Sequence, residues 1–297
     1  MATPQMHDEE YRLDVEVVSR LVARQFPQWA DLPVRSVSSS GTINALFRLG
    51  DDLLARLPRV AQGAEGVYHE HRWLPRLASA LPVKVPVLLG EGSPDAELGY
   101  PSPWSVLEWL DGDNPEPGCV EDPDALAQDL AAFVAAMRAI DVLGAPPAYR
   151  GGPLHERDEF VRTSLVMLHD DIDTAAALRL WEQSLQTPVW TGRPVWVHSD
   201  LMPGNLLTED GRLTGVIDFA ASGIGDPACD LMPAWSLLTS SARSAFMEAL
   251  GVDEATWLRG LGWALCQAAG ALPYYRITNP VMAHTARLVL DEILADS

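Results

Sequence analysis

The stretch from Val195 to Leu231 constrains the fold more than any other part of the chain. Short apolar runs alternate there with polar residues, a pattern that predicts strand, loop, strand, turn, strand, loop and helix in that order. Asp200, Asn205 and Asp218 stand where loops leave the apolar runs. A single Asp after a strand is typically a turn residue or a helix cap. Three such residues in a fixed order beside predicted strands indicate a functional site instead.

The spacing of these residues indicates phosphoryl transfer. His198, Asp200 and Asn205 fit H-x-D-x-x-x-x-N, the catalytic-loop spacing of kinases. That reaction needs a carboxylate that accepts or orients the proton of the attacking hydroxyl, and oxygen ligands for the Mg²⁺ that neutralises the phosphates. We therefore predict that Asp200 is the catalytic residue and that Asn205 and Asp218 bind Mg²⁺.

Three segments carry a resemblance to a known family. H-S-D-L-M-P-G-N-L-L, G-V-I-D-F and G-D-P-A-C-D-L are similar to the aminoglycoside phosphotransferase family of antibiotic kinases. The resemblance runs from about Ser38 to the C-terminal helices and is tightest between Val195 and Trp235. It implies a protein-kinase-like two-lobe α+β fold, with a small N-terminal antiparallel sheet lobe and a larger, mainly helical C-terminal lobe. Ser199 stands where the family usually has Gly, and we expect its small side chain to fit.

Three further residues near this core are expected to support the site rather than to react. His198 is expected to brace the Asp218 segment. Asp226 is predicted to cap a helix that has Pro227 at its first position. The resemblance implies that Asp230 is a buried brace for the catalytic loop, which has to be held rigid.

The boundary between the lobes is predicted at the end of a strand over Trp104–Leu110. We expect a nucleotide-binding lobe over residues 1–110 and a catalytic and substrate-binding lobe over residues 111–297. The passage at this boundary resembles the inter-lobe hinge of kinases, so backbone groups around Glu108 and Leu110 are predicted to bind a purine. The sequence does not choose between ATP and GTP as the phosphate donor.

The first lobe is predicted to contain a helix over residues 11–26 and a three-stranded meander over residues 33–58. Small residues fill the turn between the first two strands, so backbone N–H groups there can approach phosphates. We predict nucleotide contacts from Ser40, Gly41 and Asn44 in this turn.

The third strand is predicted to carry the phosphate-binding cation. Kinases use a lysine at this place, which contacts the phosphates and pairs with a helix glutamate. The only lysine, Lys84, lies beyond the next predicted helix. Arg56 occupies the matching position, and a guanidinium can both bind phosphate and pair with a carboxylate. Glu70, in a helix predicted over residues 64–80, is the expected partner, with Glu65 as the second choice.

Apolar periodicity and turn residues predict the remaining elements. One strand is expected over residues 83–90. The expected helices cover residues 122–140, 156–169, 174–187, 239–250, 253–271 and 280–295.

The composition of the chain indicates which kinds of partner it can bind and in which cellular compartment it is expected. The net charge is −20, from 21 basic and 41 acidic residues. This charge argues against nucleic acid and anionic membranes, and it permits a cationic small molecule. No apolar run approaches a membrane span, and the N-terminus lacks the features of a signal peptide. The 3 cysteines are far apart and have no metal-ligand spacing, so we expect a cytoplasmic protein with free thiols.

The acceptor is predicted less sharply than the reaction. The resemblance implies an aminoglycoside hydroxyl, bound by acidic residues of the second lobe; the candidates are Asp158, Glu159, Asp170 and Asp171. An aromatic wall that includes Trp263, Tyr274 and Tyr275 would instead suit a less polar acceptor such as a macrolide. Small-metabolite kinases that act on choline, homoserine or similar hydroxyls also fit the pattern. The oligomeric state stays open.

Two other classes of protein are alternatives to a small-molecule kinase. A protein kinase would need a G-x-G-x-x-G loop, an A-P-E segment and room for an activation loop after Asp218, and the chain lacks all three. A non-catalytic nucleotide-binding module on a kinase fold would not need Asp200, Asn205 and Asp218 together.

Overall fold

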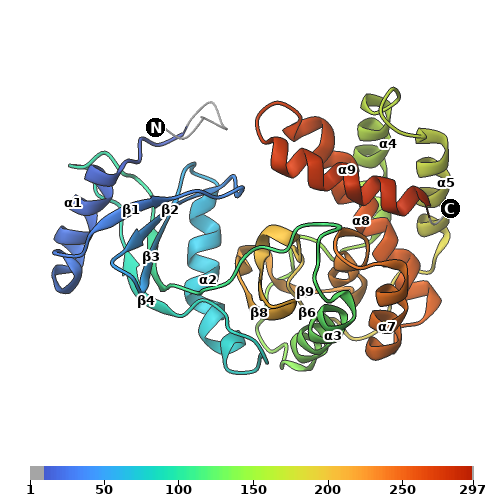
Figure 1. The fold of residues 1–297 in the computed structure, drawn as a ribbon, viewed down its shortest axis with the longest axis horizontal. Coiled ribbons are helices and arrows are strands. Elements are labelled where there is room, and N and C mark those ends of the chain that lie inside the picture. Colours follow the sequence, from blue (N-terminus) through green and yellow to red (C-terminus); the bar gives the residue numbers. More distant parts are fainter. Residues whose placement is uncertain (1–9, 296–297) are drawn as a thin grey trace. The chain divides into compact units, whose positions relative to one another are not determined.

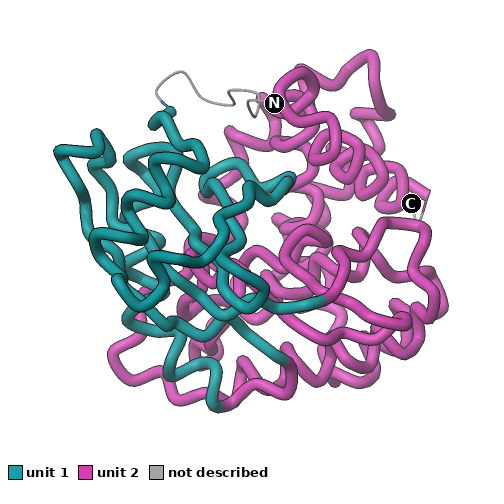
Figure 2. The backbone as a smooth tube through the Cα atoms, turned by 60° about the vertical axis from the view of Figure 1, so that its left-hand side comes forward, with its two compact units in different colours: residues 1–79, 84–111 teal, residues 80–83, 112–297 magenta. Residues whose placement is uncertain are grey.

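The computed structural model of the protein describes residues 10–295. These residues fall into two compact units, drawn in different colours in Figure 2. Unit 1 comprises the chain up to Ser79 together with Lys84–Asp111, and unit 2 comprises Ala80–Val83 together with the chain from Gly112 onward. Unit 1 holds the larger sheet and unit 2 is mainly helical, which confirms the predicted α+β architecture.

Unit 1 is built on a 5-stranded antiparallel sheet of order β1-β2-β3-β5-β4 (Figure 1). Gly50, with a φ of 60°, makes the tight connection between β2 and β3, and the register pairs Leu49 with Leu53. Two helices accompany the sheet. The elements are α1 (Val15–Gln25), β1 (Val34–Val37), β2 (Asn44–Leu49), β3 (Leu53–Pro58), α2 (Gly63–Ala78), β4 (Leu88–Gly92) and β5 (Trp104–Glu108).

The core of unit 1 lies between α1 and one face of the sheet. Asp14 caps α1 by accepting a hydrogen bond of 2.9 Å from the backbone N–H of Val17, and the helix ends before Pro27, as the sequence predicted. Its buried stripe packs on alternate residues of the central strands, because side chains two apart on a strand share a face. The members of this core include Val18, Leu21, Val22, Phe47, Leu49, Trp104 and Val106.

Unit 2 is organised around its longest helix, α8, against which α4, α5 and α9 pack (Figure 1). Two small antiparallel sheets complete it, one pairing β6 with β9 and the other pairing β7 with β8. The helices are α3 (Pro123–Ala139), α4 (Asp158–Met167), α5 (Thr174–Gln186), α6 (Pro233–Ser236), α7 (Ser240–Leu250), α8 (Glu254–Tyr275) and α9 (Pro280–Ala295). The strands are β6 (Val195–Val197), β7 (Leu206–Glu209), β8 (Arg212–Val216) and β9 (Gly223–Gly225).

Several predicted elements differ from the structure in extent. The strand expected over residues 83–90 is β4, which begins only at Leu88, because Pro86 has no N–H to give to a ladder. The helix expected to end at residue 271 continues through Pro273 to Tyr275. The helix expected after Asp226 is a short 3-10 helix, Pro227–Leu231. Among residues 10–295, no helix combines the length and the hydropathy that a membrane span requires.

Candidate active site

The loop after β6 brings Asp200 and Asn205 together. It closes through a short 3-10 helix, Pro203–Asn205, whose last N–H donates to the Met202 carbonyl at 2.8 Å. The Asn205 side chain then turns back on the loop: Nδ2 donates to the Asp200 carbonyl at 2.9 Å and to Asp200 Oδ2 at 3.1 Å. Asn205 therefore holds one oxygen of the Asp200 carboxylate in a fixed direction.

The hairpin formed by β7 and β8 carries Asp218 to the same place. Leu206 pairs with Val216 at the open end of the hairpin, and the Ile217 N–H donates to the Asn205 carbonyl at 2.9 Å. Asp218 follows directly, with a left-handed φ of 61° that is rare for a non-glycine residue. Such backbone strain concentrates at functional sites, where the surrounding structure maintains it. The sequence thus folds Asp200, Asn205 and Asp218 into one cluster.

Buried polar residues hold this loop from behind. The His198 side chain is fully buried; Nε2 lies 3.1 Å from the Ile217 carbonyl, and Nδ1 accepts from the Asp200 N–H at 3.3 Å. A carbonyl only accepts hydrogen bonds, so the imidazole proton lies on Nε2. His198 thereby links the loop after β6 to the segment before Asp218, which is the contact that the sequence analysis expected of it.

Asp230 reaches the loop from the 3-10 helix that follows Pro227. Its two carboxylate oxygens accept the N–H groups of His198 at 2.7 Å and Ser199 at 2.8 Å. Burial raises the pKa of Asp230, and the two backbone hydrogen bonds oppose that shift. Ser199 has a φ of 65°, which explains why glycine suits this position, and its hydroxyl donates to the Ala221 carbonyl at 2.7 Å. The serine fits because its hydroxyl finds this partner.

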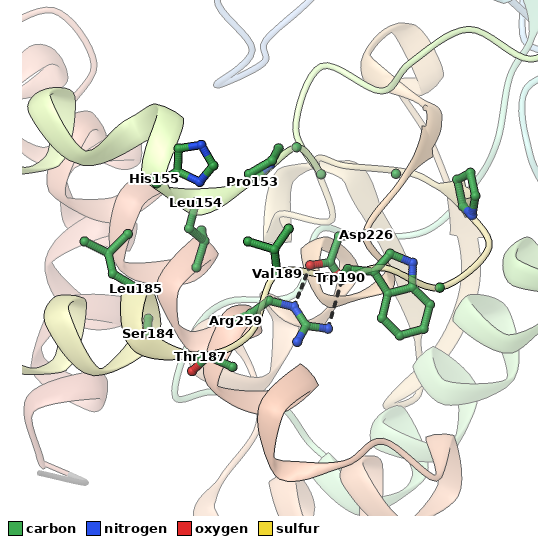
Figure 3. Close-up of a pocket in the computed structure, with 15 residues that line it drawn as sticks. Pro153, Leu154, His155, Ser184, Leu185, Thr187, Val189, Trp190, Asp226 and Arg259 are labelled. Atoms are coloured by element: carbon green, nitrogen blue, oxygen red, sulfur yellow. Dashed lines mark hydrogen bonds and ion pairs between the residues drawn. The ribbon is translucent and has the colours of Figure 1, made fainter.

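Asp226 caps the 3-10 helix and also forms a buried ion pair. Oδ1 accepts from the Ala228 N–H at 2.9 Å, and Oδ2 accepts from Arg259 Nε at 2.6 Å. The pair lies beside a cavity of unit 2 (Figure 3), which Pro153, Leu154, Val189 and Trp190 also line. Arg259 was not predicted, because nothing local in α8 marks it as a partner of residue 226.

Arg150 is a second residue that sequence reasoning missed, and it contacts Asp200 directly. Its Nη1 donates to Asp200 Oδ1 at 2.7 Å and to the Ser199 carbonyl at 3.0 Å. Burial would lower the pKa of Arg150, but the acidic neighbours, Asp200 first among them, outweigh it and leave that pKa raised. The loop around Arg150 has no periodic pattern, so only the three-dimensional structure places this charge against Asp200.

The donor atoms of the cluster fit a hard divalent cation. Because Asn205 uses Nδ2 to bind Asp200, its Oδ1 points away from that carboxylate, and no residue of the described chain donates to Oδ1. An amide oxygen and the Asp218 carboxylate are ligands that Mg²⁺ accepts alongside phosphate oxygens and water. Within residues 10–295, no group of three or more His, Cys, Asp or Glu side chains is placed to bind a metal ion. A cation at this cluster would therefore need the additional phosphate and water ligands.

In unit 1 the predicted phosphate-binding residues form their own cluster. Arg56 Nη1 forms a buried ion pair with Glu70 Oε2, the partner that the sequence favoured over Glu65. With its amide oriented to satisfy both groups, Asn44 accepts from Arg56 Nε at 3.1 Å and from Nη2 at 2.9 Å. Arg56 and Glu70 are 8% and 5% exposed, so the guanidinium is held from two sides.

Two backbone N–H groups in the turn and the predicted hinge of unit 1 already have partners within the chain. In the turn, the Gly41 N–H donates to Ser39 Oγ at 3.0 Å, and Ser40 lies next to it. In the hinge segment, the Glu108 N–H is bonded to the Val87 carbonyl at 2.9 Å. The neighbouring Leu110 N–H has no partner in the described part of the chain.

Two of the predicted acceptor residues already form ion pairs within the chain. Asp158 Oδ1 accepts from Arg162 Nε and from Trp181 Nε1, both at 2.8 Å, which ties α4 to α5. Asp171 forms an ion pair with Arg276.

Three other predicted acceptor residues lie at the surface, whereas Trp263, predicted as part of an aromatic wall, is buried in the core that α8 forms. Asp170 lies 3.0 Å from His169 and is 87% exposed. Glu159 is exposed on α4, and Tyr274 is exposed near the end of α8.

Comparison with known proteins places the chain among phosphotransferases. Residues 35–264 match the model of the phosphotransferase enzyme family. The GDP complex of wild-type aminoglycoside 2'-phosphotransferase-IIIa is 21% identical over 96% of this chain and 99% of that chain, with a TM-score of 0.75. A macrolide 2'-phosphotransferase from Brachybacterium faecium is 22% identical over 94% of this chain and 98% of that chain, with a TM-score of 0.62. At these identities the structural likeness shows a shared fold.

Proposed function

Because the chain belongs to the phosphotransferase enzyme family and is therefore a kinase, we propose that it transfers the γ-phosphate of ATP or GTP to a hydroxyl of an antibiotic, most specifically an aminoglycoside. The observation that carries this proposal is the cluster at the end of β6. There Asn205 Nδ2 binds Asp200 Oδ2 at 3.1 Å, and the Asn205 carbonyl binds the residue before Asp218. The three residue types of phosphoryl transfer are thereby held on one scaffold.

In this proposal Asp200 orients the acceptor hydroxyl and accepts its proton. The hydroxyl oxygen forms a bond to the γ-phosphorus while the bond from phosphorus to the bridging oxygen breaks, and the nucleoside diphosphate leaves with that electron pair. Positioning and charge neutralisation supply nearly all the catalysis in this reaction class.

The remaining residues bind the donor. Asn205 and Asp218 would hold Mg²⁺, which when bound neutralises the β- and γ-phosphates. Arg56 supplies a cation to the phosphates from unit 1, where Glu70 and Asn44 fix its orientation. The Ser40–Gly41 turn and the backbone at Glu108 and Leu110 bind the rest of the nucleotide.

The charge of the chain supports a cationic acceptor such as an aminoglycoside. A net charge of −20 favours the approach of a polycation, since electrostatic steering acts over distances beyond direct contact. Among the predicted acidic ligands, Glu159 and Asp170 stay exposed, whereas Asp158 and Asp171 are engaged by Arg162 and Arg276.

Because Asp158 and Asp171 are already ion-paired with arginines, a less polar acceptor such as a macrolide is the second candidate. Apolar side chains are exposed on α4 and at the end of α8: Phe160 is 51% exposed, Met167 54% and Tyr274 62%. Phe160 packs over Gly270, one helical turn before Tyr274, so these two aromatic residues share a side of α8. An exposed apolar surface of this kind suits the hydrocarbon face of a large, weakly charged acceptor.

Nucleotide consumption by the purified protein tests the proposal. The acceptor panel would span aminoglycosides, macrolides, choline and amino-alcohol metabolites, with ATP and GTP supplied separately in the presence of Mg²⁺. Mass spectrometry would identify the phosphorylated product, and Asp200→Ala would be the control. Phosphorylation of an aminoglycoside that disappears in the variant is the expected result. Turnover on a macrolide alone would show that the acceptor is a macrolide and not an aminoglycoside. Full activity of Asp200→Ala would overturn the assignment of Asp200 as the catalytic residue.

A further inference from the structure

Arg150 is partly buried and is held against the Asp200 carboxylate by several contacts. The Arg150 side chain is 20% exposed and the Asp200 side chain 28%. One guanidinium nitrogen, Nη1, makes both hydrogen bonds to the catalytic loop, to Asp200 Oδ1 and to the Ser199 carbonyl. The side chain also lies over the Tyr149 ring, 5.1 Å from its centroid. These contacts fix the orientation of the charged group.

The backbone on both sides of Arg150 is fastened to the segment that follows Asp218. The Tyr149 N–H donates to the Ala221 carbonyl at 3.0 Å, and the Gly151 carbonyl accepts from the Asp226 N–H at 2.8 Å. Gly151 has a φ of 110° and lies so close to Gly225 that a Cβ on Gly225 would come within 2.9 Å of the Gly151 carbonyl. The chain therefore holds Arg150 from the same segment that carries the predicted metal ligand.

The rest of the Arg150 guanidinium is not used within the protein. In residues 10–295, neither Nε nor Nη2 makes a hydrogen bond, and the side chain retains solvent access. A guanidinium presents its N–H donors in a planar fork that matches two oxygens of a phosphate. The unused edge of Arg150 is thus a preformed donor pair for an anion, located at the carboxylate that would receive the acceptor proton.

We propose that Arg150 is a catalytic cation that binds the oxygens of the phosphoryl group during its transfer. The inference rests on the proposed phosphotransfer at Asp200. Negative charge lies on the equatorial oxygens of the phosphoryl group in the transition state, and an arginine supplied in cis stabilises it. Nη1 keeps Asp200 directed toward the acceptor hydroxyl, while Nε and Nη2 bind the group in transfer. The bonds that form and break are those of the step described above, and Arg150 remains protonated throughout.

Arg157 provides a matched control, because it stands nearby in the chain, at the end of the short 3-10 helix Leu154–Arg157, and also lies over the Tyr149 ring, 5.9 Å from its centroid. Within the described part of the chain its side chain donates one hydrogen bond, to the Tyr149 carbonyl at 3.3 Å, and it makes none to Asp200. Arg150→Met and Arg157→Met therefore remove the same charge from neighbouring positions. We expect kcat to fall by about 10²- to 10³-fold in the first variant and to stay within about threefold in the second. Arg150→Lys should retain more activity than Arg150→Met, because it keeps a charge without the fork.

A binding experiment separates a catalytic role from a structural one. Nucleoside diphosphate with Mg²⁺ would be titrated into each protein by calorimetry, with and without aluminium fluoride as a mimic of the phosphoryl group in transfer. We expect fluoride to tighten binding about 10²-fold or more in the wild type and in Arg157→Met. Arg150→Met should bind the diphosphate alone like the wild type and lose the tightening.

The outcomes distinguish this inference from the proposed function. If the wild-type protein phosphorylates no acceptor, the proposed function fails and the fluoride titration still tests Arg150. If the wild type is active and Arg150→Met keeps both its kcat and the fluoride effect, Arg150 is only a structural counter-ion and the inference is wrong. If Arg150→Met does not fold, the comparison of Arg150→Lys with Arg157→Lys replaces it. Equal kcat and equal fluoride tightening in those two variants would overturn the inference.

Discussion

Asp230 accepts a hydrogen bond of 2.8 Å from the backbone N–H of Ser199, 31 residues earlier in the chain. Its other carboxylate oxygen accepts the N–H of His198 at 2.7 Å. Two adjacent donors of the catalytic loop thus depend on one buried carboxylate. Because Asp200 is the next residue of the loop, its position depends on Asp230, although Asp230 itself reacts with nothing.

Asp230→Asn tests this dependence. The amide offers one acceptor oxygen to two N–H donors, so one of them loses its partner in a buried place. We expect a loss of about 1–3 kcal/mol in the free energy of unfolding and a fall in kcat, because the loop shifts. Urea unfolding and steady-state kinetics measure the two effects.

Asp129→Asn is the control for this experiment. Asp129 also accepts a backbone N–H, that of Leu213, at 3.1 Å, but it lies outside the catalytic loop. This variant should lose some stability and keep its kcat. A wild-type kcat in Asp230→Asn would show that the carboxylate does not position Asp200.

Ser199 combines a left-handed φ of 65° with complete burial, which predicts an order of stability among its variants. Ser199→Gly relieves the strain, worth roughly 1–2 kcal/mol, but loses the hydrogen bond to Ala221, worth about 1 kcal/mol, so its net change should be small. Ser199→Ala keeps the strain and loses the bond, and Ser199→Val adds bulk. The expected order, measured by urea unfolding, is Gly above Ala above Val. An alanine variant more stable than the glycine variant would contradict the role of strain.

The sequence predicted the parts of the site that lie close together in the chain. The spacing of Asp200 and Asn205 predicted that they share one loop, where they are hydrogen-bonded, and the apolar runs around Asp218 predicted the hairpin that returns to that loop. The partner of Arg56 was also predictable, because Glu70 lies on the next helix and points to the same core. Local periodicity and spacing are sufficient where the partners belong to consecutive elements.

Contacts between distant, irregular segments were not predictable in the same way. Arg150 meets Asp200 from a loop without periodicity. The segment between Asp218 and the next helix was expected to be a loop, but it contains the short strand β9. Gly223 pairs there with Val197. This position requires a glycine, because a Cβ on it would come within 2.5 Å of the Ala148 N atom. The close approach of a neighbouring backbone requires a residue without a side chain here, and this requirement outweighs the low strand propensity of glycine.

The cysteines predict a simple labelling pattern. Burial raises the pKa of the Cys266 thiol to about 11 and that of Cys229 also above its ordinary value, whereas Cys119 is exposed. Because the thiolate is the reactive form, an alkylating reagent should modify Cys119 alone in the native protein. Mass spectrometry after brief labelling at about pH 8 checks this, and Cys119→Ser should abolish the reaction. Rapid labelling of Cys266 in the native state would contradict the buried packing of α8.

Acid should destabilise unit 1 through His71. Burial lowers the pKa of His71 from its ordinary value of 6.5, against the opposing effect of Glu91. The unfolded chain therefore binds more protons than the folded chain just below that ordinary value. The stability contributed by neutral His71 is fully present above pH 6.5 and is lost as the pH falls from there through the lower pKa of the folded state. Thermal unfolding from about pH 8 to pH 5.5 should show this loss, and His71→Gln should flatten the slope while His169→Gln, at an exposed position, should not.

The buried pair of Arg56 and Glu70 predicts that stability and nucleotide binding can be separated. Glu70→Ala leaves a buried guanidinium without its carboxylate and should cost about 3–5 kcal/mol. Glu65→Ala, at the exposed alternative position, should change stability by less than about 0.5 kcal/mol. The double variant Arg56→Met with Glu70→Leu should recover most of the stability, because apolar residues of similar volume replace a buried pair at little cost. That variant lacks the phosphate-binding cation, so its KM for the nucleotide should rise even though it folds. A double variant with wild-type stability and a wild-type nucleotide KM would show that Arg56 is a structural residue of unit 1.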